Sequence, residues 1–471
     1  MNADLERLLN GVQVAAVICN QWGDTGKGKF ADYFSAEWAD VVARGTGGNN
    51  AGHTVVVGDE KRVFHLLPAG ITQDDRGVVN VLGKGMVIDC AVLNEELDAL
   101  TEQGYTYDNL VISQDAHVIL PDHVMRDGKN KNMKKGGIGS TGRGIGPCYA
   151  DRTARFGIRM RDMVDTDRLD NALQRLMRHH PDIGRDAVIA YAERCMPRLV
   201  PHVRNADAYV QRAHADGKRI LLEGAQGLLL SIDHGTYPYV TSSDPSLNGT
   251  ANGVGLSARA VDLPLGIIKF PFMTRVGAGP FPTELGGRRS EEYCADADNH
   301  KLPQELADWG IPHTDGVYDT KDPAIMDMIR SSDPFVQGIG LRLCAGEYGA
   351  TTARPRRVGW TDGVAGRYAV GKNGPIFVLT KVDCLAGAPH FALCESYEHD
   401  NRITDEFDPG VLYDVEPYLR WYEGYGDISD VASFDGLPDT LRCAIDDFQE
   451  MTGGYVAIVS TGADREQTIV R

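Results

Sequence analysis

The sequence of 471 residues lacks the features that mark several large classes of protein. It contains no run of 18 consecutive apolar residues, so we predict no membrane-spanning segment. It has no low-complexity tract, and its hydrophobic fraction of 42% is ordinary for a folded chain. The N-terminal residues have neither the basic start nor the apolar run of a secretory signal peptide, and we therefore expect a cytoplasmic protein.

Cysteine is scarce, and its spacing argues against two kinds of site. Nine cysteines are scattered along the chain, and the closest pair, Cys384 and Cys394, is ten residues apart. No CxxC pattern indicates a zinc site, and an odd number of cysteines in a large chain favours reduced thiols over a disulfide framework. We interpret these cysteines as buried residues without a catalytic role.

Basic residues are outnumbered by acidic ones. The chain has 48 Lys and Arg against 66 Asp and Glu, which gives a formal net charge of −18. Nonspecific nucleic-acid binding needs a positive field that releases counterions, so this composition argues against it. Small anionic substrates remain compatible with the composition, because a local basic pocket can form on an acidic protein.

Glycine, in contrast, is abundant, and its 54 residues cluster beside short apolar runs. Nearly all-apolar runs of this length are typical of parallel strands that are covered on both faces. The sequence therefore predicts an α/β fold with a large, mostly parallel central sheet. The predicted strands are Val12–Cys19, Val78–Leu82, Ile220–Leu222, Ile376–Leu379 and Tyr455–Val459.

Two stretches of the chain differ from this pattern. Between about residues 160 and 218, Leu169, Leu173 and Leu176 recur at helical spacing, which predicts a helical subdomain. Residues from about 286 to 335 are acidic and have no clear periodicity, so we interpret them as a surface insertion. Such an insertion could act as a lid or a dimer contact, or could only decorate the surface.

The first predicted strand leads into residues 23–29, which have the G-x4-G-K spacing of a phosphate-binding loop. In such a loop, backbone N–H groups surround the phosphates and a lysine neutralises them. The hydroxyl residue that would bind Mg²⁺ is replaced by Phe30, and Asp24 offers oxygen ligands instead. The alternative, a glycine-rich turn with two exposed lysines, accounts less well for the buried strand before it.

A second nucleotide motif follows the strand at Ile376–Leu379. The tetrapeptide Thr380-Lys381-Val382-Asp383 has the [NT]-K-x-D pattern of proteins that recognise guanine. Its carboxylate can accept two hydrogen bonds from guanine that adenine cannot donate, and the lysine stem can pack along the base. The tetrapeptide alone is a weak signal, but together with the phosphate loop it favours GTP over ATP.

Four further segments carry side chains suited to nucleotides or carboxylates. His53 follows the glycine-rich residues 44–52, although an isolated histidine is more often structural. Residues 138–147 combine hydroxyls, glycines and an arginine, as a second phosphate site would, and Gln226 could contact the edge of a base. Residues 351–357 hold three arginines and suit carboxylate or phosphate binding, and Pro355 favours an ordered loop over a solvated basic face.

These segments together closely resemble the adenylosuccinate synthetase family, the GTP-dependent ligases that join IMP to L-aspartate. The resemblance spans nearly the whole chain and implies a single domain over residues 1–471 with a P-loop-like GTP-binding core. The matching motifs are QWGDTGKGK at 21–29, GGNNAGHT at 47–54, STGRGIGP at 140–147, EGAQG at 223–227, DHGTYPYVTSS at 233–243, TRVGAGPFPTEL at 274–285, TTARPRR at 351–357, TKVD at 380–383 and STGADR at 460–465.

The resemblance implies a reaction in two steps, at the point of entry to AMP in purine biosynthesis. Asp24 would act as a general base at N1 of IMP, so that the 6-oxygen attacks the γ-phosphate of GTP. His53 would stabilise this transfer, and Gln226 would support the purine edge. The amine of aspartate then displaces phosphate from the 6-phosphoryl intermediate and gives adenylosuccinate.

The resemblance also implies which residues bind each ligand. Mg²⁺ would be held by Asp24 and by the backbone of Gly52. The implied GTP contacts are Gly23, Thr25, Gly26, Lys27, Gly28, Lys29, Thr54, Arg356, Lys381, Asp383, Ser460 and Gly462. The implied IMP contacts are Asp24, Lys27, Asn50, His53, Thr141, Gln226, Thr241 and Arg354, with Arg155 from the second subunit of a homodimer. The implied aspartate contacts are Ala350, Thr351, Thr352, Ala353, Arg354 and Arg356.

The chain departs from the family pattern at several positions. Thr25 stands where the family usually has Glu, Ala353 where it has Gly, and Asp244 where it has Asn. Because Thr25 neighbours the purine pocket, a different purine nucleotide such as dGMP is an alternative substrate, although the retained Asp24 favours IMP. A non-catalytic GTP-binding regulatory protein is a second alternative, but it predicts a damaged catalytic pair, and Asp24 and His53 are both present.

Overall fold

The structure is a computed structural model that describes residues 3–57, 60–129, 138–349 and 353–471, without the side chains of residues 53–63 and 74. The chain folds into two compact units. Unit 1 comprises Met1–Ile18, Lys27–His234 and Val240–Leu265, and unit 2 comprises Cys19–Gly26, Gly235–Tyr239 and Gly266–Arg471. Among the described residues, no helix is long and apolar enough to cross a membrane.

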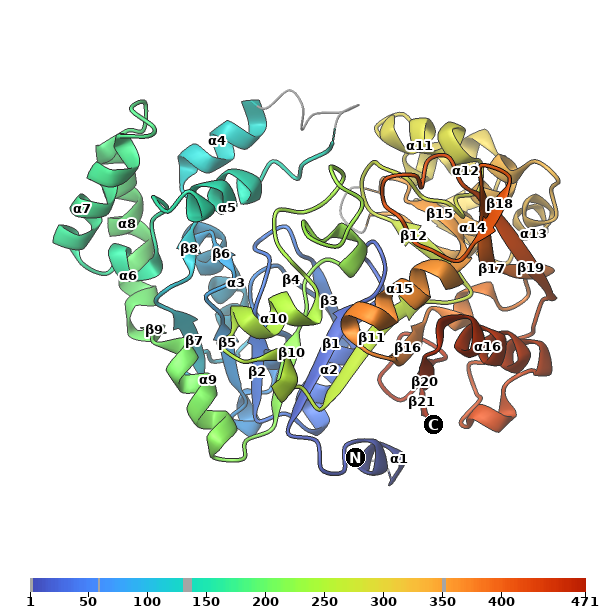
Figure 1. The fold of residues 1–471 in the computed structure, drawn as a ribbon, viewed down its shortest axis with the longest axis horizontal. Coiled ribbons are helices and arrows are strands. Elements are labelled where there is room, and N and C mark those ends of the chain that lie inside the picture. Colours follow the sequence, from blue (N-terminus) through green and yellow to red (C-terminus); the bar gives the residue numbers. More distant parts are fainter. Residues whose placement is uncertain (1–2, 58–59, 130–137, 350–352) are drawn as a thin grey trace. The chain divides into compact units, whose positions relative to one another are not determined.

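Unit 1 is built on parallel strands. Each neighbouring pair in the order β1-β10-β2-β5-β7-β9 is parallel, and the strands β1, β10 and β2 are fully buried. Their apolar side chains are covered on both faces, which is the reason that the sequence shows continuous rather than alternating hydrophobic runs. These strands are β1 (Val14–Cys19), β10 (Ile220–Glu223), β2 (Val41–Arg44), β5 (Val79–Leu82), β7 (Leu110–Ser113) and β9 (Val203–Arg204), labelled in Figure 1. The α/β class, with a large and mostly parallel sheet, is confirmed.

The helices of unit 1 follow the expected capping chemistry. Asp89 accepts hydrogen bonds from the backbone N–H groups of Ala91 and Val92 at the start of α3. Residues 160–218 are mainly helical, and Leu169, Leu173 and Leu176 lie buried on one face of α7, as their spacing predicts. Whether this region is a separate subdomain stays a prediction. The α-helices are α1 (Ala3–Leu8), α2 (Lys27–Glu37), α3 (Cys90–Glu102), α4 (Pro121–Lys129), α5 (Ile145–Thr153), α6 (Met160–Met163), α7 (Thr166–Met177), α8 (Arg185–Leu199), α9 (Ala206–Ala215) and α10 (Leu247–Gly253).

Unit 2 contains the strands of the guanine motif and a second sheet. Strands β16 (Ile376–Thr380) and β20 (Tyr455–Ser460) are parallel neighbours, which confirms the two predicted strands, and β21 (Thr468–Val470) pairs antiparallel with β20. Strand β11 (Leu263–Lys269) is the neighbour of β16 in the strand order. The second sheet contains β12 (Phe272–Arg275), β15 (Arg357–Asp362), β17 (His390–His399), β18 (Arg402–Thr404) and β19 (Glu416–Glu423), and α14 (Pro334–Ala345), α15 (Gly363–Asn373) and α16 (Asp439–Thr452) are the longer helices.

Residues 286–335 contribute to the core of unit 2. Leu306, Ile325 and Ile329 have no exposed surface and belong to the same hydrophobic cluster as Trp360 and Phe448. This differs from the expectation of a surface segment, because the short helices place their few apolar residues inward while the acidic ones dominate the sequence. Whether the segment is an insertion stays a prediction. Its elements are α11 (Gly287–Ala295), α12 (Leu302–Asp308), β13 (His313–Thr314), β14 (Val317–Tyr318) and α13 (Pro323–Ile329).

Candidate active site

The phosphate loop joins strand β1 to helix α2 through a sharply bent backbone. Gly23, Asp24 and Gly26 all have positive φ angles, of 89°, 51° and 75°. Few residues other than glycine take this conformation, and those that do concentrate at functional sites. Helix α2 begins at Lys27, so its free N–H groups follow directly on the loop. The predicted strand–loop–helix order is therefore present.

Asp24 forms an ion pair with an arginine that the sequence also singled out. Its Oδ2 lies 3.0 Å from Nε of Arg356, and 40% of the Asp24 side chain is exposed. Burial alone would lower the pKa of Arg356, but the carboxylates of Asp24 and Glu347 outweigh burial and raise it. Arg356 therefore stays charged beside Asp24, whose carboxylate remains accessible from outside.

In unit 1, three segments that are far apart in the sequence meet at Gln226. The Nζ of Lys27 donates to the backbone oxygen of Gln226 at 2.7 Å, and Nε2 of Gln226 donates to Oδ1 of Asn50 at 3.1 Å. Within the described part of the chain, Oε1 of Gln226 is buried and has no hydrogen-bond donor. Lys27, Asn50 and Gln226 are thus brought together as predicted, and a ligand could supply the missing donor.

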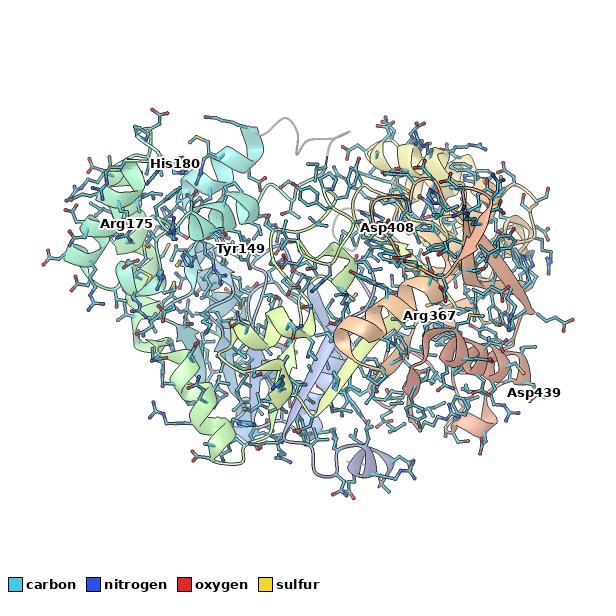
Figure 2. The ribbon with its side chains drawn as sticks, in the orientation of Figure 1. Tyr149, Arg175, His180, Arg367, Asp408 and Asp439 are labelled. Carbon is cyan, nitrogen blue, oxygen red and sulfur yellow. The ribbon has the colours of Figure 1, made fainter. Side chains whose placement is uncertain are left out.

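At position 47, beside this group, the structure requires a glycine. Its φ of 83° is unfavourable for other residues, and a Cβ there would lie 2.9 Å from both Cβ of Ala225 and Oε1 of Gln226. The N–H of Gly47 donates to the hydroxyl of Tyr149, which donates in turn to the carbonyl of Gly85 at 2.9 Å. Tyr149 is labelled in Figure 2. The close approach of backbone and amide therefore requires glycine.

The guanine motif packs against the phosphate loop within unit 2. The hydroxyl of Thr380 lies 2.8 Å from the carbonyl oxygen of Thr25 and 2.9 Å from that of Ile268. Lys381 has a φ of 60°, which ends strand β16 and turns the chain toward Asp383. Because β16 and β20 are parallel neighbours, the TKVD and STGADR motifs leave the sheet at the same edge. There, Oγ of Ser460 donates to the carbonyl of Gly462 at 2.8 Å.

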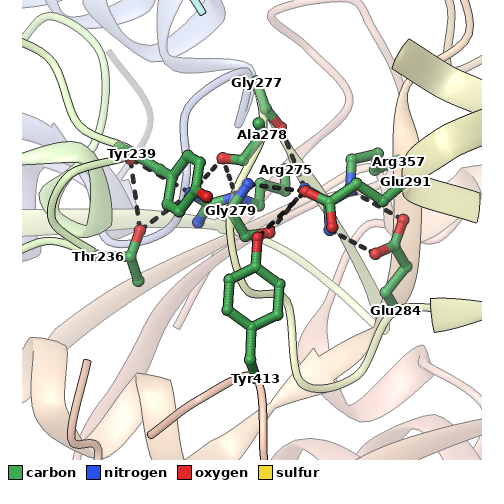
Figure 3. A network of polar contacts seen from close by, with 10 residues as sticks. All are labelled: Thr236, Tyr239, Arg275, Gly277, Ala278, Gly279, Glu284, Glu291, Arg357 and Tyr413. Carbon is green, nitrogen blue, oxygen red and sulfur yellow. Dashed lines mark hydrogen bonds and ion pairs between the residues drawn. The ribbon is translucent and has the colours of Figure 1, made fainter. Parts of the chain in front are cut away.

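The three arginines of residues 351–357 have different surroundings. Arg354 is about half exposed and pairs with Asp298 at 2.8 Å. Arg356 pairs with Asp24, as described. Arg357 is 5% exposed, and Figure 3 shows it between Glu284 and Glu291. The charge of Arg357 is therefore neutralised inside the protein, and this arginine holds the loop of residues 275–284 rather than facing a ligand.

The same loop holds a second buried arginine. Nη2 of Arg275 donates to the hydroxyl of Thr236 at 2.9 Å and to the carbonyl of Ala278 at 2.6 Å (Figure 3). Burial lowers the pKa of Arg275 well below its usual value, and the nearby Arg357 lowers it further. Carbonyl and hydroxyl oxygens are its main partners, so this arginine serves to fix the backbone of the motif.

Several predicted site residues are exposed or half-buried in unit 1, and others lie outside the described part of the chain. Thr141 and Arg155 are exposed in unit 1, the exposed Gly52 precedes β3 (His53–Val57), and Thr241 is half-buried. Ala353 has a φ of 52°, a conformation that suits the Gly of the family pattern. The side chains of His53 and Thr54, and the whole of Ala350, Thr351 and Thr352, lie outside the described residues.

Two residues of the site region were not predicted from the sequence. Glu347 and Lys269 form a buried ion pair with an Nζ–Oε2 distance of 2.7 Å. Lys269 ends the otherwise apolar strand β11, and Glu347 stands three residues before the aspartate loop. The one sequence signal was the single charge of Lys269 at the end of an apolar strand, and this signal does not indicate which residue pairs with it. Among the described residues, no group of three or more His, Cys, Asp and Glu side chains is placed to hold a metal ion.

Comparisons with known proteins agree with these motifs. The family model described as adenylosuccinate synthetase matches residues 16–469. An adenylosuccinate synthetase of Pelotomaculum thermopropionicum is 40% identical over 96% of this chain and 97% of its own, and one of Thermobifida fusca is 38% identical over 96% and 98%.

Solved structures extend the comparison to the fold. A fully ligated adenylosuccinate synthetase from Plasmodium falciparum has a TM-score of 0.80 and 30% identity, covering 98% of this chain and 100% of its own. A cyanophage S-2L succinoaminodeoxyadenylate synthetase bound to dGMP and dATP has a TM-score of 0.56 and 20% identity over 98% and 95%, and shows the fold alone. The chain belongs to the adenylosuccinate synthetase family, the GTP-dependent ligases that join L-aspartate to IMP through a C–N bond.

Proposed function

We propose how the residues of this chain carry out the family's reaction, in which IMP, L-aspartate and GTP give adenylosuccinate, GDP and phosphate. The observation that carries the proposal is the ion pair between Asp24 and Arg356 on the bent phosphate loop. A carboxylate that is paired with an arginine, yet 40% exposed, is placed to accept a proton from a bound ligand.

In the first step, Asp24 would take the proton from N1 of IMP while the 6-oxygen attacks the γ-phosphorus of GTP. The negative charge that develops on the phosphoryl oxygens would be neutralised by Lys27 and by the N–H groups at the start of α2. His53 would stabilise the same transfer. The P–O bond to GDP breaks, and the product is 6-phosphoryl-IMP.

In the second step, the amine of aspartate would attack C6, and the C–O bond to phosphate would break. A carbonyl oxygen is a poor leaving group, and phosphorylation makes it a good one. Gln226 would hold the purine edge, since its Oε1 has no donor within the described residues, and Asn50 fixes its amide. The exposed guanidinium of Arg354 would bind a carboxylate or phosphate. The remaining predicted contacts of each ligand stay predictions.

Mg²⁺ fits the donor set of the phosphate loop. The carboxylate of Asp24 is exposed beside the phosphate-binding backbone, and Mg²⁺ in nucleotide sites is usually held by one or two carboxylates together with phosphate oxygens. When bound, the metal would neutralise charge on the transferring phosphoryl group. The carbonyl of Gly52 is the second proposed ligand.

The two alternative functions are not favoured. Curated relatives at 38–40% identity are named adenylosuccinate synthetases, whereas the cyanophage structure bound to dGMP is 20% identical. A regulatory protein without ligase activity would need no paired Asp24. We further propose a cytoplasmic, reducing environment, which the nine free cysteines support.

The test is the replacement of Asp24 by Asn. The amide keeps the shape of the side chain but cannot take the proton, so kcat should fall about 1,000-fold in an absorbance assay of adenylosuccinate formation. Asp40→Asn is the matched control, because Asp40 pairs with Arg219 and is not among the predicted site residues, and this variant should keep wild-type kcat. A wild-type kcat in Asp24→Asn would show that another group accepts the proton.

A further inference from the structure

Glu347 is a buried carboxylate surrounded by three cations of unit 2. Its side chain has no exposed surface, and its Oε2 accepts from Nζ of Lys269 at 2.7 Å and from Nη1 of Arg356 at 2.9 Å. Its Oε1 lies 3.7 Å from Nζ of Lys381 and has no hydrogen-bond donor within the described residues. One carboxylate thus pairs with cations from three separate segments of the chain.

Two of these three cations are predicted contacts of GTP. Arg356 is the partner of Asp24, and Lys381 belongs to the guanine motif. The backbone is held as well, because the N–H of Arg356 donates to the carbonyl of Glu347 at 3.0 Å. Glu347 therefore connects the phosphate end of the GTP site with the base end.

Lys269 connects this group of charged residues to the segment just before the phosphate loop. Its backbone N–H donates to Oε1 of Gln21 at 3.0 Å, and Nε2 of Gln21 donates to its carbonyl at 3.1 Å. Its Nζ also donates to the hydroxyl of Thr274 at 2.9 Å. Since Gln21 lies two residues before the loop, the cluster of Glu347, Lys269, Arg356 and Lys381 is connected to the segment that carries Asp24.

The charge state of the cluster is consistent with this arrangement. Burial alone would raise the pKa of Glu347, but attraction to Lys269, Lys381 and Arg356 outweighs burial and lowers the pKa to about 2. Burial lowers the pKa of Lys269 to about 8, with the attraction of Glu347 opposing the shift. Both groups are charged at neutral pH, so Glu347 acts as a permanent anion.

We infer that Glu347 is a positioning residue for GTP, whose two carboxylate oxygens set Arg356 and Lys381 in one fixed geometry. The inference rests on the proposed roles of these two residues. A single buried anion between two ligand-facing cations orients both and keeps them from pairing elsewhere. The competing interpretation is that Glu347 only neutralises the buried Lys269.

Three variants separate the two interpretations. Glu347→Gln removes the anion and leaves Lys269 buried without its partner. The double variant Lys269→Met with Glu347→Gln removes both buried charges at similar volume and so restores the balance of charge. Glu347→Asp keeps the charge but withdraws the carboxylate by one methylene. Asp362→Asn is the control, since Asp362 is also a buried carboxylate of unit 2 but contacts Tyr397 and Ala365.

The readouts are kcat/KM for GTP, KM for IMP and the melting temperature. In Glu347→Gln we expect kcat/KM for GTP to fall about 100-fold, which is the cost of misplacing reacting groups by about an ångström. KM for IMP should change less than about threefold, because the effect acts on GTP. The double variant should regain melting temperature but not kcat/KM for GTP. Asp362→Asn should keep wild-type kinetics at pH 7.

Recovery of kcat/KM for GTP in the double variant would overturn the inference, because Glu347 would then only neutralise Lys269. Wild-type GTP kinetics in Glu347→Gln would overturn it as well. If neither uncharged variant folds, Glu347→Asp decides: a loss of about tenfold or more supports positioning, and wild-type kinetics refute it. A failure of the proposed function itself would appear separately, as normal kcat in Asp24→Asn.

Discussion

Unusual backbone conformations mark the site residue by residue. Among the described residues, eight non-glycine residues have positive φ angles, and five of them are predicted ligand contacts. Strained conformations persist where the surrounding structure determines them, and they aim side chains in directions that regular elements do not allow. The five are Asp24, Arg155, Gln226, Ala353 and Lys381.

Asp383 provides a residue-scale prediction about base selectivity. An Asn in its place cannot accept both hydrogen bonds that guanine donates, so Asp383→Asn should lower kcat/KM for GTP about 100-fold. The Asn amide can instead donate to the 2-carbonyl of xanthine, so the variant should prefer xanthosine triphosphate. Steady-state kinetics with both nucleotides measure this exchange.

The control for this prediction is Asp427→Asn, an exposed carboxylate in the same unit that binds Ser429. This variant should have the wild-type kcat/KM for GTP, and its kcat/KM for xanthosine triphosphate should not increase. Unchanged nucleotide preference in Asp383→Asn would contradict the assignment of Asp383 to guanine.

At the scale of elements, buried carboxylates join helices to their neighbours. Asp151 of α5 accepts from Nη2 of Arg126 at 2.6 Å and lies 3.0 Å from Nε2 of His123, both on α4. His180, labelled in Figure 2, lies 3.2 Å from the other oxygen of Asp151. The carboxylate therefore fixes α5, the helix that begins within the STGRGIGP motif and ends just before Arg155.

Helix α15 begins at a buried acid that should make stability depend on pH. Oδ1 of Asp362 accepts from the N–H of Ala365 at 3.1 Å, and Oδ2 accepts from the hydroxyl of Tyr397 at 2.5 Å. Burial raises the pKa of Asp362 from 3.8 to about 6, despite these hydrogen bonds. The folded chain therefore binds this proton more tightly than the unfolded chain does.

This contribution to stability is present at low pH and is lost as the pH rises through about 6. Between pH 4 and pH 7 the wild type should therefore lose on the order of 3 kcal/mol of unfolding free energy through this group, and Asp362→Asn should not. The unfolding free energy of the variant relative to the wild type should rise by that amount over the same range. Urea unfolding at the two pH values measures this. Glu450→Gln, at an exposed position of α16, should follow the wild type. Parallel profiles of Asp362→Asn and wild type would contradict the assignment.

At the scale of the whole molecule, we propose a homodimer in which Arg155 completes the site of the other subunit. Arg155 is exposed just after α5 and has a φ of 70°, a conformation that is uncommon for residues other than glycine. Arg155→Ala alone should therefore be inactive, as should Asp24→Asn. Mixed dimers of the two variants would contain one site with both native residues.

Mixing equal amounts of the two inactive variants should restore about a quarter of wild-type activity, because half of the dimers are mixed and each has one intact site. Subunit exchange followed by the adenylosuccinate assay measures this recovery. A mixture of Asp24→Asn with Asp383→Asn is the control and should stay inactive, because both residues serve the same subunit's site. Absence of recovery with Arg155→Ala, in dimers shown to exchange, would place Arg155 in its own subunit's site.

Local patterns were sufficient to predict five of the strands, the phosphate loop and the motifs, whereas other strands, such as β2, β11 and β15, were not predicted. Continuous apolar runs can only be buried strands or helices, and their glycine-rich ends identified the loops, as at Val14–Cys19 and Ile376–Thr380. The segment of residues 286–335 was less predictable, since its apolar residues are few and its packing on Trp360 depends on distant partners.

The sequence by itself determined the fold class, the two nucleotide motifs and the family of this protein, because these depend on spacing within short segments. Only the tertiary structure decided the partners of the charged residues. It assigned Arg356 to Asp24 and Arg357 to the carboxylates of Glu284 and Glu291, although the two arginines are adjacent in the chain. It also placed Glu347 among three cations. Ion pairs act through space over a few ångströms. The carboxylates that pair with Arg357, 66 and 73 residues away, and Asp24, 332 residues from Arg356, therefore leave no mark in the local sequence.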